Sequence, residues 1–140
     1  MDSIRARRHT VVIVDDHPDF LVSIRNLVQV DCDVVAALED GSQAVEAVCS
    51  LNPDVVILDV SMPVLDGFAA ARRLRASGTR TEIVFVSATE DSEYALTAHE
   101  LGASFVVKRR MNQELMKAIR TAAEVSCAGR TSQRNEPDSH

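Results

Sequence analysis

Acidic residues stand directly after two of the apolar runs in this sequence. Asp15 and Asp16 follow Val11–Val14, and Asp59 follows Val55–Leu58. If these runs are neighbouring parallel strands, about 4.8 Å apart, the three carboxylates crowd one small volume at the edge where open α/β sheets bind ligands. Such a cluster is unfavourable without a positive charge inside it. Carboxylate oxygens suit a hard divalent cation, above all Mg²⁺, so the spacing predicts a magnesium site.

Two further apolar runs end in polar side chains. Ser87 follows Ile83–Val86, and Lys108 follows Phe105–Val107. A hydroxyl, an ammonium group and a cation that converge on one carboxylate would offset the charge of a transferred phosphoryl group. Each residue alone has a plainer explanation, since an Asp after a strand is commonly a turn residue or a helix cap. Because four of the five apparent strands end this way, the coincidence favours phosphoryl-transfer chemistry.

The elements that would position these side chains follow a β-α order repeated five times. The four runs and a weaker one, Val34–Leu38, are rich in Val and Ile and lack polar alternation, which is typical of strands buried on both faces. Segments with helical period lie between them. Pro18 suits a first helical position, and Gly78 and Gly102 stand where helices should end. The pattern predicts an α/β fold, a five-stranded parallel sheet with helices on both faces.

Composition and charge exclude several classes of protein. The chain has 140 residues, 46% of them hydrophobic, and a net charge of -6, which predicts one globular domain that does not bind nucleic acid directly. We find neither a signal peptide nor an apolar run that could span a membrane, so we expect a cytoplasmic protein. Three cysteines without a CxxC pair indicate neither disulfides nor zinc. The four histidines show no ligand spacing among themselves.

Four motifs together resemble the receiver domain of two-component response regulators, in the style of LuxR/NarL-like proteins. They are V-V-I-V-D-D (11–16), L-D-V-S-M-P-V-L-D-G-F (58–68), V-S-A (86–88) and G-A-S-F-V-V-K (102–108). The resemblance covers roughly residues 10–124. It implies the doubly wound, flavodoxin-like (βα)5 receiver fold with strand order 2-1-3-4-5. We therefore expect a receiver domain over residues 10–125, between an N-terminal tail (1–9) and a polar C-terminal tail without regular structure (126–140).

The resemblance implies a phosphoacceptor and a set of metal ligands. Asp59 matches the aspartate that accepts the phosphoryl group. Asp16 matches the carboxylate that binds Mg²⁺ directly, and Asp15 matches its partner, which acts largely through water. The backbone carbonyl of Ser61 matches the third protein ligand. Around them, the loop that shapes the site would include Met62, Pro63 and Gly67.

The resemblance also implies a switch. Ser87 matches the hydroxyl that turns to the phosphoryl group, Lys108 matches the lysine that contacts it, and Phe105 occupies the aromatic switch position. The sequence departs from the common pattern at three places: Ser87 replaces a frequent Thr, Phe105 replaces a frequent Tyr, and Arg109 replaces a frequent Pro. Losing the tyrosine hydroxyl removes any hydrogen bond from a phenol.

The function implied is that of a phosphorylation switch and not of an enzyme. A sensor histidine kinase or a histidine phosphotransfer protein would donate the phosphoryl group, and the output would be altered affinity for a downstream effector protein. Homodimerisation stays open. One alternative is the receiver portion of a DNA-binding LuxR/NarL-type regulator, whose reading frame would continue past His140. A phosphatase of the haloacid dehalogenase type is disfavoured, because its second Asp would fall at Ser61.

Overall fold

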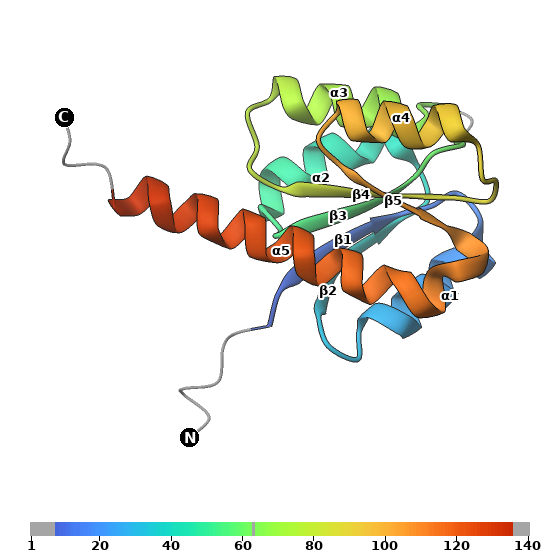
Figure 1. The fold of residues 1–140 in the computed structure, drawn as a ribbon, viewed down its shortest axis with the longest axis horizontal. Helices are drawn as coiled ribbons and strands as arrows, with labels where there is room; N and C mark the ends of the chain where they lie inside the picture. The colour runs from blue at the N-terminus through green and yellow to red at the C-terminus, as the bar shows by residue number, and fades with distance from the viewer. Residues whose placement is uncertain (1–7, 63, 136–140) are drawn as a thin grey trace.

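The structure, a computed structural model that describes residues 8–62 and 64–135, has one five-stranded parallel sheet (Figure 1). The strands are β1 (Thr10–Val14), β2 (Asp33–Leu38), β3 (Val55–Asp59), β4 (Glu82–Ser87) and β5 (Ser104–Val107). Their order is β2-β1-β3-β4-β5, which confirms the predicted fold class and strand order. Each strand contains its predicted apolar run, and polar neighbours lengthen it because their backbone groups pair in the same ladder.

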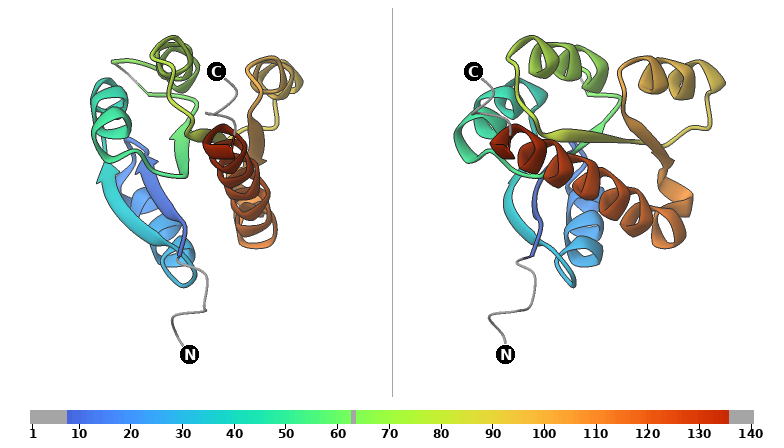
Figure 2. Two further views of the ribbon diagram at one scale, coloured as in Figure 1. Left: turned by 90° about the vertical axis from the view of Figure 1, so that its left-hand side faces the viewer. Right: turned by 60° about the vertical axis from the view of Figure 1, so that its left-hand side comes forward.

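Helices cover both faces of the sheet (Figure 2). Two of them, α1 (Pro18–Val28) and α5 (Met111–Asn135), lie on one face. The other face carries α2 (Ala44–Leu51), α3 (Gly67–Ala76) and α4 (Ser92–Glu100). Two single 3₁₀ turns, η2 (Gly41–Gln43) and η3 (Lys108–Arg110), lead into α2 and α5. The alternation of strands and helices along the chain produces the doubly wound arrangement.

The sheet separates two hydrophobic cores. Along β1, Val11 and Ile13 enter the core beneath α1 and α5, whereas Val12 and Val14 enter the core on the opposite face. All four side chains are fully buried. Burial on both faces explains why the strand sequences lack polar alternation.

Local chemistry sets several helix ends. Pro18 occupies the first turn of α1, as predicted. Asp66 caps α3 by accepting a 2.8 Å hydrogen bond from the backbone N–H of Ala69. Gly78 and Gly102 adopt φ angles of 81° and 70° just after α3 and α4, which confirms their predicted role as helix stops. Asn52 ends α2 in the same left-handed conformation, with φ 51°.

The C-terminal region differs from the expectation. Residues 126–135, predicted to lack regular structure, continue α5 to Asn135, and residues 136–140 lie outside the described chain. The sequence of this stretch is polar, but polar residues do not by themselves end a helix. Gly129 costs only about 1 kcal/mol in a helix interior, and Pro137 is the first proline beyond. The last turns of α5 leave the body of the domain (Figure 1).

The N-terminal residues are tied down earlier than predicted. Arg8, expected in a tail covering residues 1–9, donates 2.8 Å hydrogen bonds to the carbonyls of Gln29 and Cys32 and pairs with Asp33 at 2.8 Å. Carbonyls that follow a helix lack partners within it, so a guanidinium group is attracted there. Residues 1–7 lie outside the described chain. None of the described helices combines the length and apolarity needed to cross a membrane.

Candidate functional site

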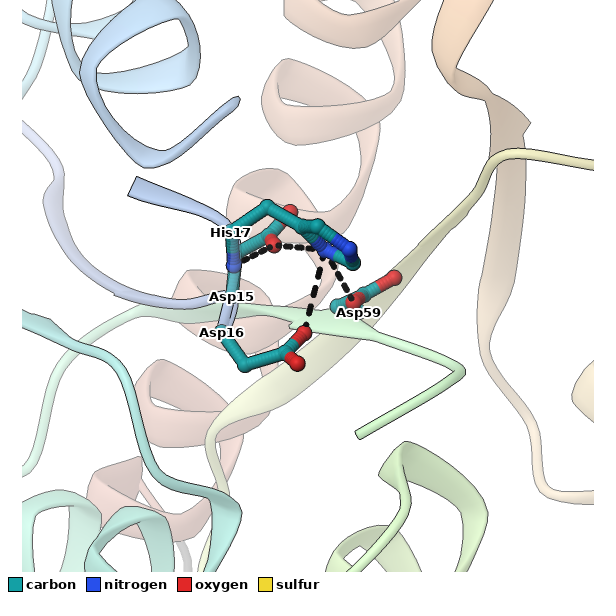
Figure 3. Close-up of side chains that lie close together, drawn as sticks. All are labelled: Asp15, Asp16, His17 and Asp59. Carbon is teal, nitrogen blue, oxygen red and sulfur yellow. Dashed lines mark hydrogen bonds and ion pairs between the residues drawn. The ribbon is translucent and has the colours of Figure 1, made fainter. Parts of the chain in front are cut away.

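The three carboxylates predicted to converge do lie together at the carboxyl edge of the sheet. Asp15 and Asp16 follow β1, and Asp59 ends β3, the neighbouring strand. One ligand atom from each of them, and one from His17, lie within 4.8 Å of one another (Figure 3). The cluster stands where the strand order reverses: β2 lies on one side of β1, and β3 lies on the other. The topology of the sheet therefore creates the site.

Buried oxygens in the cluster lack hydrogen bonds. Asp15 is fully buried, Asp59 is 2% exposed and Asp16 is partly buried. Within the described residues, Asp16 Oδ1 and Asp59 Oδ2 have no hydrogen bond, and Asp15 Oδ2 is met by the ammonium group of Lys108. An ionised oxygen that is buried and unsatisfied costs several kcal/mol unless a cation compensates it. The pocket is therefore built for a positively charged ligand.

Lys108 supplies part of that positive charge. Its Nζ lies 2.8 Å from Asp15 Oδ2 and 3.4 Å from Asp59 Oδ1. The ammonium group also lies 4.0 Å from the centroid of the Phe20 ring, a cation–π contact, and the residue is 5% exposed. One ammonium group faces three carboxylates, so negative charge remains uncompensated in the cluster.

The acidity of Asp59 reflects this imbalance. Burial of the carboxyl, and then the charge of Asp15, raise the pKa of Asp59 from 3.8 to about 6, although Lys108 opposes the shift. Both causes disfavour the ionised form of the side chain. A divalent cation at the site would favour that form and so prepare Asp59 to act as a nucleophile.

The residues present fit a hard divalent cation. Three carboxylates, two of which have an oxygen without a hydrogen bond, form an oxygen-rich donor set that suits Mg²⁺. Ser61, whose carbonyl was predicted as a further ligand, is exposed in the loop after β3. Together with Asp66 and Tyr94 it borders an open cavity of about 470 Å³. This cavity lies beside the loop that carries Ser61.

Ser87 stands at the same edge but outside the carboxylate cluster. It ends β4, is 3% exposed and lies beside Val107 of β5. Its hydroxyl accepts a 3.1 Å hydrogen bond from the backbone N–H of Thr89 and lies 3.4 Å from the Thr89 hydroxyl. Because Ser87 accepts in the first of these contacts, its hydroxyl proton can still be donated to another acceptor.

Phe105 lies beside Phe85 in the β4–β5 ladder and is partly buried. It borders a cavity of about 290 Å³ between β5, the start of α4 and α5. Nearby, Glu90 pairs with Arg109 at 2.6 Å and with Arg110 at 2.5 Å, joining the loop before α4 to η3. The side chain of Phe105 thus has adjoining free volume.

The loop between β3 and α3 approaches the cluster closely because of Gly67. A Cβ atom at this position would lie 2.3 Å from the backbone oxygen of Asp59, a clash that no side chain tolerates. Gly67 also donates a 2.9 Å hydrogen bond to the carbonyl of Val60. Met62 is buried in the same loop, and Pro63 lies outside the described residues. The loop is therefore held against the end of β3.

Sequence reasoning missed His17. The imidazole Nδ1 lies 3.1 Å from Asp16 Oδ1, 3.4 Å from Asp15 Oδ1 and 3.9 Å from Asp59 Oδ2 (Figure 3). The four histidines lack ligand spacing among themselves, so spacing between histidines gave no signal. The signal was the adjacency of His17 to the Asp15–Asp16 pair, which places a nitrogen beside two predicted metal ligands.

Comparison with known sequences identifies relatives over most of the chain. The response regulator receiver domain family matches residues 11–120. The DNA-binding transcriptional activator EvgA of Escherichia coli K12 is 36% identical over 118 residues, 83% of this chain and 58% of EvgA. The chemotaxis protein CheY of Bacillus subtilis is 33% identical over 79% of this chain and 94% of CheY. The chain spans just over half the length of EvgA.

Solved structures show the same architecture. The signal receiver domain of the putative response regulator NarL from Mycobacterium tuberculosis superposes with a TM-score of 0.80 at 30% identity, covering 85% of this chain and 98% of that domain. The response regulator domain of Thermotoga maritima CheB gives a TM-score of 0.75 at 28% identity, with 84% and 98% covered. These matches agree in fold and extent with the family matched by sequence.

Proposed function

This chain belongs to the response regulator receiver domain family, whose members are switch domains, and from that premise we propose that Asp59 accepts a phosphoryl group from phosphohistidine. The proposal rests on one observation above all. The buried carboxylate of Asp59 at the end of β3 has one oxygen without a hydrogen bond, lies beside two further carboxylates and is 3.4 Å from a buried ammonium group. This is the environment that phosphoryl transfer to a carboxylate requires.

In this proposal the residues divide the transfer between them. An oxygen of Asp59 attacks the phosphorus, and a P–O bond forms while the P–N bond to the donor imidazole breaks and the imidazole leaves with the electron pair. Lys108 compensates negative charge beside Asp59. Asp15, Asp16 and the carbonyl of Ser61 would hold Mg²⁺, which when bound neutralises charge on the phosphoryl oxygens. Positioning and charge compensation carry the reaction, so no separate enzyme active site is needed.

The consequence of phosphorylation is a change in the surface formed by α4, β5 and α5. A phosphoryl group adds acceptor oxygens beside Asp59. Ser87 donates its hydroxyl proton to one of these oxygens, and Phe105 moves in the volume next to it. Because α4 has a single fully buried side chain, Ala98, rearranging this helix disrupts little packing.

The partners follow from the same chemistry. The donor is a sensor histidine kinase or a histidine phosphotransfer protein, and the output is binding of a downstream effector. In this proposal the domain acts in the cytoplasm, where ATP is available to the kinase. A second candidate is the receiver portion of a DNA-binding regulator, which the similarity to EvgA supports. The sequence of the gene beyond the codon for His140 distinguishes the two.

Intact-mass measurement tests the proposal directly. The chain is incubated with phosphoramidate, a small donor with a P–N bond, in the presence of Mg²⁺. We expect one phosphoryl group per chain, no gain with excess chelator and none in Asp59→Asn. Asp31→Asn, an exposed aspartate outside the site, is the matched control and should be labelled normally. Full labelling of Asp59→Asn would contradict the assignment.

A further inference from the structure

His17 is held over the carboxylates by its own backbone. Its N–H donates a 2.9 Å hydrogen bond to Asp15 Oδ1, and its ring meets Phe20 edge-on at 6.2 Å between centroids. The side chain is 59% exposed, so no buried partner explains its position. The backbone contact fixes the start of the side chain beside the cluster, and Figure 3 shows the imidazole pointing toward the three carboxylates.

The distances around Nδ1 match those between ligands of a single ion. Two ligands at right angles, each about 2.1 Å from an octahedral cation, are about 3 Å apart. Nδ1 lies 3.1 Å from Asp16 Oδ1 and 3.4 Å from Asp15 Oδ1. Asp59 Oδ2, at 3.9 Å, fits a wider angle. Among the described residues, neither Asp16 Oδ1 nor Asp59 Oδ2 forms a hydrogen bond.

We propose that His17 is a nitrogen ligand of the metal site and makes it selective for a first-row transition cation, Mn²⁺, over Mg²⁺. This inference rests on the proposed function, because it requires that Asp16 and Asp59 hold a divalent cation. Carboxylates alone suit Mg²⁺ and Mn²⁺ alike. An imidazole nitrogen adds affinity for transition cations and little for Mg²⁺, which prefers oxygen ligands and bound water.

Pulsed EPR on the untagged full chain with Mn²⁺ detects a directly bound nitrogen. We expect ¹⁴N modulation from the bound Mn²⁺ that disappears in His17→Leu. His99→Leu is the matched control, because His99 is an exposed histidine of α4 that is distant in sequence from His17. This variant should retain the modulation. Bound Mn²⁺ that shows no ¹⁴N modulation in the unmodified chain overturns the inference.

Calorimetric titration tests the selectivity separately. In His17→Leu we expect Mn²⁺ affinity to fall about tenfold, the scale of losing one contributor to a metal site, while Mg²⁺ affinity changes little. An equal loss for both cations overturns the inference. Asp16→Asn and Asp59→Asn keep the two proposals apart: if neither variant weakens Mn²⁺ binding, the carboxylate metal site itself is wrong. If both weaken it and the ¹⁴N signal is absent, only the role of His17 is wrong.

Discussion

At the scale of single residues, Asp59 is a group whose charge opposes folding. Its pKa is raised from 3.8 to about 6, first by burial and second by the charge of Asp15. The folded state therefore holds this proton more tightly than the unfolded chain. The stability contributed by protonated Asp59 is fully present below about pH 4 and is lost as the pH rises through about 6.

Asp59→Asn should therefore stabilise the metal-free domain at a pH above that pKa. A pKa raised from 3.8 to about 6 corresponds to an increase in the free energy of unfolding on the order of 3 kcal/mol, since each pH unit is worth about 1.4 kcal/mol. The gain should shrink toward zero near pH 4, where Asp59 itself is protonated. Urea unfolding in chelator at both pH values measures it, with Asp31→Asn as control. A gain of equal size at both pH values would argue against this electrostatic cause.

Lys108 compensates charge at the site without holding the metal. In Lys108→Met we expect Mg²⁺ affinity to rise about tenfold, because a cation a few ångströms away repels the ion by at least 1 kcal/mol at an effective dielectric of about 20. The response to phosphorylation should be lost. Titration of Mg²⁺ and NMR of the phosphorylated chain separate the two effects. Lys117→Met, an exposed lysine of α5, is the matched control. Loss of Mg²⁺ binding in Lys108→Met would assign the lysine a different role.

At the scale of elements, the start of α3 depends on the absence of one side chain. A Cβ at Gly67 would lie 2.3 Å from the backbone oxygen of Asp59. Gly67→Ala should therefore displace the loop, weaken metal binding and lower the free energy of unfolding by about 3 kcal/mol or more, as overpacked positions do. Gly78→Ala is the control, because a Cβ added at this position would have no atom within 4 Å. Its cost, about 1 kcal/mol, comes from the left-handed φ alone. Thermal unfolding of both variants measures the difference. Equal losses would show that packing against Asp59 is not the cause.

The sequence predicted the elements well wherever the sheet buries them. β1 and β3 are buried on both faces, so their continuous apolar runs identified them, and the carboxyl ends of these strands located the site. Features that depend on weaker local contacts were not predictable. Residues 126–135 continue α5 without an apolar stripe to reveal it. The placement of His17 depends on a backbone hydrogen bond to Asp15, and the resemblance to receiver domains, rather than periodicity, supplied the strand order.

At the scale of the whole molecule, we expect a change at Asp59 to reach a distant surface. Phe105 borders a cavity of about 290 Å³ beside α4 and α5, and α4 buries only Ala98 completely. Adding beryllofluoride and Mg²⁺, which mimic a phosphoryl group, should shift NMR signals of Phe105 and α4. The signals of α2, on the far side of α3, serve as an internal control and should stay unchanged. Shifts confined to the loops that carry Asp15 and Asp59 would reject the switch.

Trapping the product shows directly whether Asp59 is the residue phosphorylated. Borohydride reduces an aspartyl phosphate to homoserine. Peptide sequencing by mass spectrometry then identifies the phosphorylated position without any substitution in the protein. After incubation with phosphoramidate and Mg²⁺, we predict homoserine at position 59 and aspartate at positions 15 and 16. Homoserine at any other acidic position, with Asp59 intact, would contradict the account.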